Sequence, residues 1–221
     1  MMSNDWRLDV LPPSQRQLWD ELIDIPDEFT LYGGTAIALY LGHRQSVDFD
    51  FFSFQDCDPE ALLRHIPFLH EAMVIQQAPN TLSCLVERGE KVQISFFGVK
   101  GLRRIDLPNV VETNQLKVAS LLDLAGMKAA VVQKRAQAKD YIDMSTMIER
   151  GAVDLPTALA AARVIYGPSF NPELTLKAFS YYGDGNLETV PEEQKECLLR
   201  EVRSVDLTYV SELEKRLMSN H

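Results

Sequence analysis

The chain has 221 residues, of which 46% are hydrophobic and 24% are charged, and its formal net charge is −10. This is the composition of a globular protein with one real core and room for a small second domain. The negative charge disfavours broad, charge-driven binding to DNA or RNA, because such binding needs basic surface that displaces phosphate counterions. A local basic groove remains compatible with it.

Several features of the sequence bear on its location. The chain contains no run of about 18 apolar residues, so we expect no transmembrane helix. The N-terminal sequence lacks a basic start followed by an apolar stretch, so we expect no signal peptide. Cys57, Cys84 and Cys197 are far apart and form no CxxC pair, which is typical of thiols in a reducing compartment and disfavours structural zinc. We therefore expect a cytoplasmic protein.

The first half of the chain mixes helical and strand patterns. Its helices show apolar residues at helical spacing, and its strands alternate or are rich in aromatic and β-branched residues. Gly42 is a natural helix end, and Asp58 with Pro59 is a natural helix start. We predict helices over residues 13–25, 35–42 and 58–69, and strands over residues 29–32, 46–53, 72–77, 81–88 and 91–98.

After about residue 112 the pattern becomes helical. The sequence shows no internal repeat and no low-complexity segment. This layout predicts an α+β core over residues 1–112, with a small mixed sheet flanked by helices, followed by a helical region over residues 113–221. Within that region we predict helices over residues 120–137, 138–151, 155–167, 172–183 and 191–219.

Two aspartates, Asp48 and Asp50, lie on one predicted strand. Side chains two positions apart share one face of a strand, with Cα atoms about 6–7 Å apart, so both carboxylates point the same way. Two partly buried carboxylates about 5 Å apart repel by roughly 3 kcal/mol at an effective dielectric of about 20. Protonation, a basic partner or a divalent cation relieves this repulsion. Mg²⁺ or Mn²⁺ suits such oxygen ligands, with substrate phosphates filling the remaining positions.

The residues before the acidic strand supply a place for an anion. A predicted strand, then Gly33-Gly34-Thr35, then a helix presents backbone N–H groups at a helix N-terminus, which suits a triphosphate. Glycine lets a phosphate approach the backbone closely. Thr35 is placed to cap the helix or hold a phosphate oxygen. Arg44 lies just before the acidic strand and is placed to bind the same phosphates.

Each part of this pattern also has a plainer interpretation. Paired glycines are often only a turn, and an Asp-x-Asp pair is often exposed charge on an edge strand. Arg44 also fits a salt bridge with Asp48. In this order and at this spacing, however, the parts favour a nucleotide site. The sequence contains none of the motifs GxxxxGK[ST], GxGxxG, HExxH and GxSxG.

The pattern GG-T-x12-D-x-D, with a strand before and after it, resembles the signature of the polymerase-beta-like nucleotidyltransferase superfamily. The wording YGGTAIALYLGHRQSVDFDFFS is similar to the AbiEii/AbiGii toxin-type nucleotidyltransferases. A second stretch, LLDLAGMKAAVVQKRAQAKDYIDM, resembles a helix of the same family. Its matching positions are Lys128, Arg135, Lys139, Asp140 and Asp143. The resemblance covers about residues 28–150, and the last 70 or so residues add no motif.

The resemblance implies transfer of a nucleotidyl group from a nucleoside triphosphate to an acceptor hydroxyl. By this comparison Asp48 and Asp50 hold one or two Mg²⁺ or Mn²⁺ ions. The triphosphate is bound by Gly33, Gly34, Thr35 and Arg44, and Lys128 adds a positive charge on a phosphate and belongs to the catalytic set. Asp140 or Asp143 serves as a further acid, on a base, on a metal or as proton acceptor.

The sequence departs from the wider fold at one point. A third carboxylate commonly stands on a later strand beside the Asp-x-Asp pair, and the matching strand, residues 91–98, contains no acid on either face. Either Asp140 or Asp143 replaces it from the helix, or the second metal and the general base are weak or absent. These helix residues also fit plainer roles, since Lys139 and Asp143, four apart, match a surface ion pair.

These observations leave three hypotheses. The first is an active Mg²⁺-dependent nucleotidyltransferase of toxin–antitoxin or phage-defence type, with an RNA such as tRNA as acceptor and a cognate antitoxin as partner. The second is a catalytically degenerate domain that binds a nucleotide or a protein, which the missing third acid supports. The third is transfer to a small cationic acceptor, which the acidic net charge would suit.

Overall fold

The computed structural model describes residues 5–219. Residues 1–4, at the start of the predicted core, and 220–221, at the end of the predicted helical region, lie outside the described part. The chain forms two compact units. Unit 1 contains Met1–Leu102 and Pro108–Ala119, and unit 2 contains Arg103–Leu107 and Ser120–His221.

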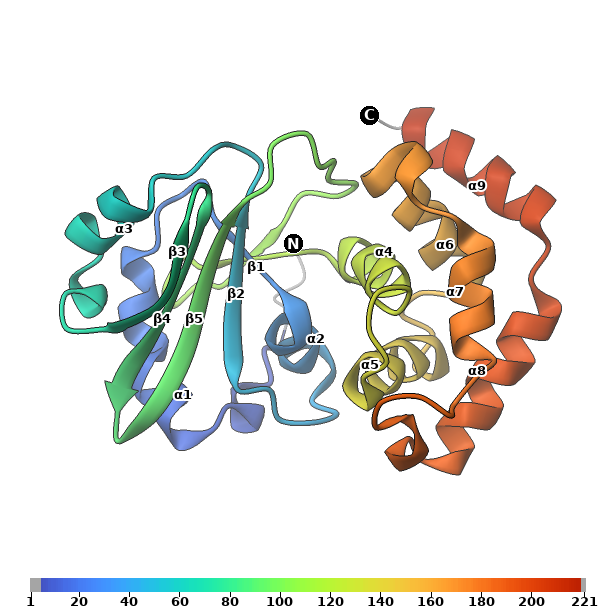
Figure 1. The fold of residues 1–221 in the computed structure, drawn as a ribbon, viewed down its shortest axis with the longest axis horizontal. Helices are drawn as coiled ribbons and strands as arrows, with labels where there is room; N and C mark the ends of the chain where they lie inside the picture. Colours follow the sequence, from blue (N-terminus) through green and yellow to red (C-terminus); the bar gives the residue numbers. More distant parts are fainter. Residues whose placement is uncertain (1–4, 220–221) are drawn as a thin grey trace. The chain divides into compact units, whose positions relative to one another are not determined.

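Unit 1 is built on a mixed sheet of seven strands in the order β3-β4-β5-β2-β1-β7-β6 (Figure 1). β2 pairs antiparallel with β1 and parallel with β5, while β1 pairs parallel with β7. The sheet and its helices match the predicted α+β core. The strands are β1 (Thr30–Tyr32), β2 (Asp48–Ser53), β3 (Met73–Ala78), β4 (Thr81–Arg88), β5 (Glu90–Gly98), β6 (Asn109–Val110) and β7 (Lys117–Val118).

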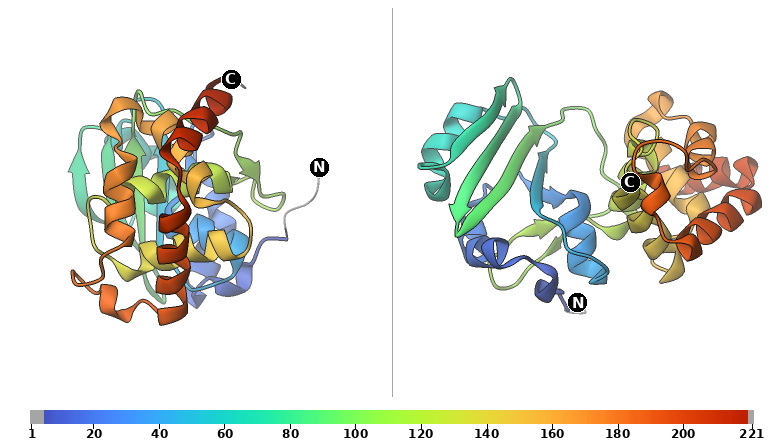
Figure 2. Two further views of the ribbon diagram at one scale, coloured as in Figure 1. Left: turned by 90° about the vertical axis from the view of Figure 1, so that its right-hand side faces the viewer. Right: turned by 60° about the horizontal axis from the view of Figure 1, so that its bottom comes forward.

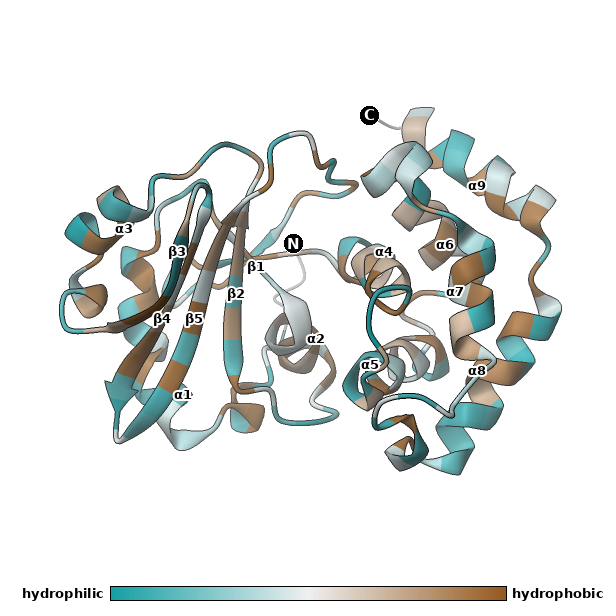
Figure 3. Cartoon of the chain, viewed as in Figure 1, coloured by the Kyte–Doolittle hydropathy of each residue, from teal (hydrophilic) through white to brown (hydrophobic). Residues whose placement is uncertain are grey.

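The five strands predicted from the sequence, β1 to β5, form close to their predicted bounds. β2 alternates between half-buried and buried positions along its whole length. The β3–β4 and β4–β5 hairpins turn at Asn80 and Gly89, both with positive φ. Figure 3 shows apolar residues through the middle of the sheet and polar residues at the tip of the β4–β5 hairpin. The two-residue strands β6 and β7 are too short to show a period and were not predicted.

Aromatic side chains fill the buried face of the sheet. The Phe51 and Phe96 rings, on the neighbouring strands β2 and β5, stack at 5.4 Å between centroids, and the Phe29 ring meets Phe96 edge-on at 5.2 Å. Trp19 covers the same face over Phe49. This packing fixes Phe49 and Phe51 of β2 inward and so presents Asp48 and Asp50 on the opposite face.

Helices of unit 1 follow the predicted pattern with two differences. The predicted helix over residues 58–69 ends at His65, because Ile66 is extended and a separate 3₁₀ turn follows from Pro67. The predicted helix over residues 13–25 is an α-helical turn followed by a 3₁₀ segment, so that Trp19 and Leu22 reach the core. Asp58 caps the helix that begins at Pro59, as predicted. The helical elements are η1 (Leu8–Val10), α1 (Pro13–Leu18), η2 (Trp19–Asp24), α2 (Gly33–Leu41), α3 (Pro59–His65) and η3 (Pro67–Leu69).

Unit 2 is helical in every regular element that the structure describes (Figure 2). Its centre is α6, which packs against both α4 and α9, and its core is rich in alanine, so that helices approach closely. The elements are α4 (Leu121–Val131), α5 (Ala138–Glu149), α6 (Leu155–Tyr166), η4 (Gly167–Ser169), α7 (Pro172–Phe179), η5 (Leu187–Thr189), α8 (Glu192–Ser204) and α9 (Leu207–Ser219).

The single helix predicted over residues 191–219 is wrong, because it is two helices. α8 ends at Ser204, and Val205 is extended. The Asp206 side chain then accepts a hydrogen bond from the Thr208 N–H at 2.8 Å, which satisfies a free donor at the start of α9. Apolar residues continue at helical spacing across this break, so their spacing alone does not reveal where α8 ends.

None of the helices formed by residues 5–219 combines the length and apolarity needed to cross a membrane. Cys57, Cys84 and Cys197 are free thiols. Cys84 and Cys197 are buried, and burial raises the pKa of the Cys84 thiol to about 11. Cys84 and Cys197 are therefore core residues, whereas Cys57 is half-buried.

Candidate nucleotide site

The N-terminus of α2 is shaped around the aspartates of β2. Gly33 has φ +75°, a left-handed conformation that turns the chain from β1 into the helix. A Cβ atom at Gly33 would lie 2.6 Å from the Oδ2 atom of Asp50. Glycine is therefore required twice here, once for the backbone conformation and once for the space that the carboxylate occupies. The Asp50 carboxylate lies directly against the first residue of the helix.

Gly34 leaves space for the guanidinium group of Arg44. A Cβ atom at Gly34 would lie 2.5 Å from the Nη2 atom of Arg44 and 3.0 Å from the Ser46 hydroxyl oxygen. The Nη1 group of Arg44 donates to the backbone carbonyl of Gln45 at 2.9 Å, which ties the side chain to its own loop. Gly33 and Gly34 thus bring a carboxylate and a guanidinium to one helix N-terminus.

Thr35 does not cap this helix. The residue before the helix is Tyr32, which makes no side-chain cap, and the Thr35 side chain is completely buried. Its hydroxyl donates instead to the backbone carbonyl of Asp48 at 2.5 Å. The helix is therefore joined to the start of β2 through a buried side chain.

Asp48 and Asp50 are both half-buried and lie on one face of β2, as the alternation predicts. In the parallel pairing with β5, Asp48 stands beside Gln93 and Asp50 beside Ser95. Ser95 is buried, and its hydroxyl shares a hydrogen bond with Ser83 at 3.0 Å. Paired positions of neighbouring strands share a face, so Gln93 and Ser95 occupy the place where a third strand carboxylate would stand.

The donor set fits a cation that substrate helps to hold. No cluster of three His, Cys, Asp or Glu side chains suited to a metal occurs between residues 5 and 219. Mg²⁺ usually keeps several waters and binds through one or two carboxylates plus substrate phosphates, rather than in a closed protein cage. Asp48 and Asp50 supply two carboxylates beside a helix N-terminus that attracts phosphate, an arrangement that fits a cation shared between protein and substrate.

Unit 2 contains the other predicted site residues, and they form a buried ion cluster. The Lys128 Nζ atom lies 2.5 Å from the Asp140 Oδ1 atom and 2.8 Å from the Asp143 Oδ2 atom. Both aspartate side chains are 0% exposed, and Lys128 is 7% exposed. Arg135 donates from Nε and Nη2 to the two oxygens of Asp140 at 2.8 and 3.0 Å. Two acids and two bases thus neutralise each other between α4 and α5.

The ion pairs of this cluster stabilise the ionised form of Asp140. Burial alone would raise the pKa of Asp140, but the hydrogen bond from Arg135 and the charge of Lys128 outweigh it, so the pKa lies below its ordinary value. Asp143 pairs with Lys128 rather than forming the surface pair with Lys139 that its spacing allows, and Lys139 is exposed. Helix spacing could not reveal this, because the partner comes from another helix.

Asp123 is a buried acid that sequence reasoning passed over. It is 1% exposed and accepts hydrogen bonds from the Ile105 and Asp106 backbone N–H groups at 2.9 and 3.0 Å. The Ser120 hydroxyl also donates to it at 2.6 Å and accepts from its backbone N–H, so α4 begins with a closed cap. Burial raises the pKa of Asp123 despite these bonds. Its role is to hold the 103–107 segment on α4; the one sequence signal is its place in the first turn after Ser120.

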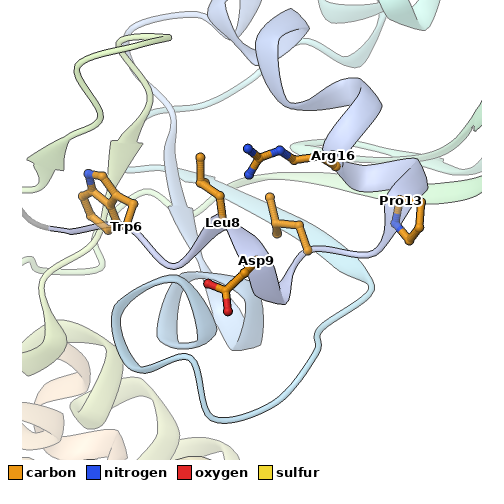
Figure 4. Close-up of a pocket in the computed structure, with 6 residues that line it drawn as sticks. Trp6, Leu8, Asp9, Pro13 and Arg16 are labelled. Atoms are coloured by element: carbon orange, nitrogen blue, oxygen red, sulfur yellow. The ribbon is translucent and has the colours of Figure 1, made fainter.

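Two surface hollows are lined by residues other than those of the glycine–aspartate site. One of about 560 Å³ in unit 1 is lined by Trp6, Leu8, Asp9, Leu11, Pro13 and Arg16, none of them a predicted site residue (Figure 4). One of about 250 Å³ in unit 2 is lined in part by Arg135 and Tyr141, next to the ion cluster. The hollow in unit 1 contains none of the residues predicted to bind a nucleotide or a metal.

The structure therefore assembles the predicted residues in two groups. Unit 1 brings Gly33, Gly34, Arg44 and Asp50 together, with Asp48 on the same strand face. Unit 2 brings Lys128, Arg135, Asp140 and Asp143 together.

Comparison with known protein families identifies the family of this chain. Residues 17–203 match the family described as nucleotidyl transferase AbiEii toxin, type IV toxin–antitoxin system. An uncharacterized protein of Aquifex aeolicus (strain VF5) is 28% identical over 205 residues, which cover 87% of this chain and 96% of that protein.

Two solved structures share the fold. MenT4, a nucleotidyltransferase toxin from Mycobacterium tuberculosis H37Rv, has a TM-score of 0.59 at 14% identity and covers 92% of this chain and 91% of its own. A candidate nucleotidyltransferase from H. pylori has a TM-score of 0.53 at 16% identity and covers 94% and 95%. With both glycine–aspartate and lysine–aspartate groups in place, the chain belongs to the AbiEii nucleotidyltransferase toxin family.

Proposed function

We propose that this nucleotidyltransferase uses Mg²⁺ or Mn²⁺ to transfer a nucleotidyl group from a nucleoside triphosphate to an acceptor hydroxyl. The observation that carries the proposal is the fit of the Asp50 carboxylate against Gly33 at the N-terminus of α2. The backbone N–H groups of a helix N-terminus attract phosphate, while the adjacent carboxylates repel it. A divalent cation between carboxylates and phosphates resolves this conflict.

The residues of the site have separate roles in this proposal. Asp48 and Asp50 hold the cation, and Gly33 and Gly34 let the triphosphate approach the helix backbone. Arg44, whose guanidinium lies against Gly34, binds a phosphate oxygen. When bound, the cation neutralises charge that develops on the triphosphate and on leaving pyrophosphate. Because Gln93 and Ser95 replace a third acid, two carboxylates and the substrate complete its coordination.

The burial of the ion cluster in unit 2 supports a structural role. Lys128 is balanced by two buried aspartates, so we propose that it holds α4 to α5. The resemblance also assigns Lys128 to a phosphate and Asp140 or Asp143 to acid–base work. That catalytic role requires Lys128 to exchange a carboxylate for a phosphate oxygen when substrate binds.

For the acceptor we propose RNA, such as tRNA. Acidic residues outnumber basic ones about two to one in unit 1, whereas they nearly balance in unit 2. Lys134, Arg135 and Lys139 have exposed positions in and beside the α4–α5 turn, where they would contact phosphates. The type IV toxin–antitoxin family also supports a cognate antitoxin as partner. Charge reversal of Lys134 and Lys139 to Glu should weaken RNA binding and flatten its salt dependence, while nucleotide binding stays unchanged.

Calorimetric titration tests the nucleotide site. Each of the four ribonucleoside triphosphates, with Mg²⁺, is titrated into the wild type and into the variant Asp48→Ala/Asp50→Ala. We expect metal-dependent binding of at least one nucleotide to the wild type and none to the variant. The control Asp20→Ala/Asp24→Ala removes two exposed acids from unit 1 and should bind like the wild type. A folded wild type that binds no nucleotide would remove the proposed function.

A further inference from the structure

Thr35 joins α2 to the start of β2 by a side-chain hydrogen bond to the backbone. Its side chain is 0% exposed, and its hydroxyl donates to the Asp48 carbonyl from 13 positions away in sequence. A residue buried in this way offers no surface to a triphosphate. Its only recorded polar contact is the backbone of a residue proposed to hold the cation.

The strand pairing shows why this bond matters. β1 ends at Tyr32, because Gly33 turns the chain into α2, and the last pair that β2 makes with β1 is Tyr32 with Asp50. Asp48 lies two residues beyond that pair. On its other side Asp48 still pairs with Gln93 of β5. The Thr35 hydroxyl therefore binds the backbone of β2 just beyond its last pair with β1.

We infer that Thr35 is a positioning residue that fixes the backbone of Asp48, and through it the direction of the Asp48 carboxylate toward a divalent cation. This inference rests on the proposed function, and it assigns Thr35 to the cation side of the site rather than to the triphosphate. The first turn of α2 therefore contacts both aspartates of β2. Gly33 leaves space for one carboxylate, and Thr35 sets the backbone that carries the other.

Removal of the hydroxyl alone isolates this effect. Thr35→Val keeps the branched shape and most of the volume but cannot donate to the Asp48 carbonyl. Thr35→Ser keeps the donor. A matched control is Thr175 in unit 2, which is also fully buried and donates to a backbone carbonyl, that of Ala129, at 2.6 Å. Thr175→Val therefore loses a similar bond that has no part in the proposed site.

The test is the affinity for Mn²⁺ without nucleotide, measured by electron paramagnetic resonance on the full chain. Partners that orient metal ligands are worth roughly 10–100-fold in affinity, so we expect a loss of about 10-fold in Thr35→Val. Thr35→Ser should stay within about 3-fold of the wild type, and Thr175→Val should bind Mn²⁺ like the wild type. If Thr35→Val does not fold, Thr35→Ala provides the same loss of the donor.

Two further outcomes separate the inference from the proposed function. Unchanged Mn²⁺ affinity in Thr35→Val, with weaker binding only of the Mn²⁺–nucleotide complex, would overturn the inference and make Thr35 a phosphate ligand. Wild-type protein that binds neither Mn²⁺ nor Mn²⁺–nucleotide would overturn the proposed function, and the inference with it. Faster amide hydrogen exchange across residues 44–53 in Thr35→Val is the expected structural signature, and unchanged exchange there would contradict it.

Discussion

The molecule contains two pairs of aspartates with opposite surroundings. Asp48 and Asp50, two residues apart on a strand, are half-buried beside glycines and a helix N-terminus. Asp140 and Asp143, three apart on a helix, are fully buried and neutralised by Lys128 and Arg135. In the proposed function the first pair holds a divalent cation, whereas the second pair is neutralised by basic side chains of the chain itself.

This difference shows that spacing alone does not decide what a pair of acids does. A strand face and a helix face both bring two carboxylates together, but burial and local partners determine whether their charge is available to a ligand. The following changes should therefore affect folding in one case and nucleotide chemistry in the other.

The largest effect is expected for Lys128→Met. It removes the Nζ group that pairs with both Asp140 and Asp143, and removal of one partner from a buried ion pair costs about 3–5 kcal/mol. Urea unfolding followed by circular dichroism measures this loss. Lys134→Met, in the exposed turn after α4, is the control and should change stability by less than about 0.5 kcal/mol. Equal stability of the two variants would show that the ion cluster does not hold α4 to α5.

Asp50→Asn should act on activity rather than stability. It keeps the shape that fits against Gly33 but halves the charge of the Asp48/Asp50 pair. Loss of a residue that only orients a metal ligand already lowers metal affinity or activity by roughly 10–100-fold. We expect nucleotidyl transfer to fall at least about 100-fold, with the unfolding free energy within about 1 kcal/mol of wild type. Glu90→Gln, an exposed acid of β5, serves as control. A transfer rate within a few-fold of wild type would exclude Asp50 as a cation ligand.

Gly33→Ala should combine strain with displacement of a carboxylate. Its φ of +75° disfavours any side chain, and the new Cβ atom would meet Asp50 Oδ2 at 2.6 Å. We expect a loss of about 1–2 kcal/mol and weaker nucleotide binding. Gly89→Ala is a matched control, because φ is +79° there and no atom lies within 4 Å of the new Cβ. If both variants lose equal stability and bind nucleotide normally, the close approach of Asp50 has no importance.

The smallest effect concerns pH. Because the pKa of Asp140 is lowered in the folded protein, its pairing stabilises the fold above the ordinary value of 3.8 and is lost as the pH falls below it. Arg135→Gln removes one source of that shift. At pH 6 the variant should be less stable by about 1 kcal/mol, since Arg135 is partly exposed and screened. Urea unfolding at pH 6 and pH 3 should show the gap closing with acid; a gap that widens would reverse the assigned direction.

Much of the site in unit 1 could be predicted from the sequence, because its signals are local. The alternation of β2 places Asp48 and Asp50 on one face, and Gly42 ends α2 in a left-handed conformation. The contact of Gly34 with Arg44 could be anticipated only as a shared phosphate site. The bond from Thr35 to the Asp48 carbonyl could not be predicted, since it depends on where β1 stops.

The cluster in unit 2 was less predictable because its partners lie on different helices. Lys128 and Asp140 were named from a resemblance, but their mutual contact follows from the packing of α4 on α5. Residues 191–219 show the same limitation, since the apolar period passes through the break before α9. There the Asp206 cap was a usable signal, because aspartate at such a position often starts a helix.

Transfer of label from nucleotide to RNA is the decisive test of nucleotidyl transfer at Asp48 and Asp50. Total cellular RNA is incubated with Mg²⁺ and each ribonucleoside triphosphate labelled at either the α- or the γ-phosphate, with wild type and with Asp48→Ala/Asp50→Ala. We expect that only α-label enters RNA, that pyrophosphate is released, and that the variant transfers none. Incorporation of γ-label, or equal incorporation by the variant, would contradict it.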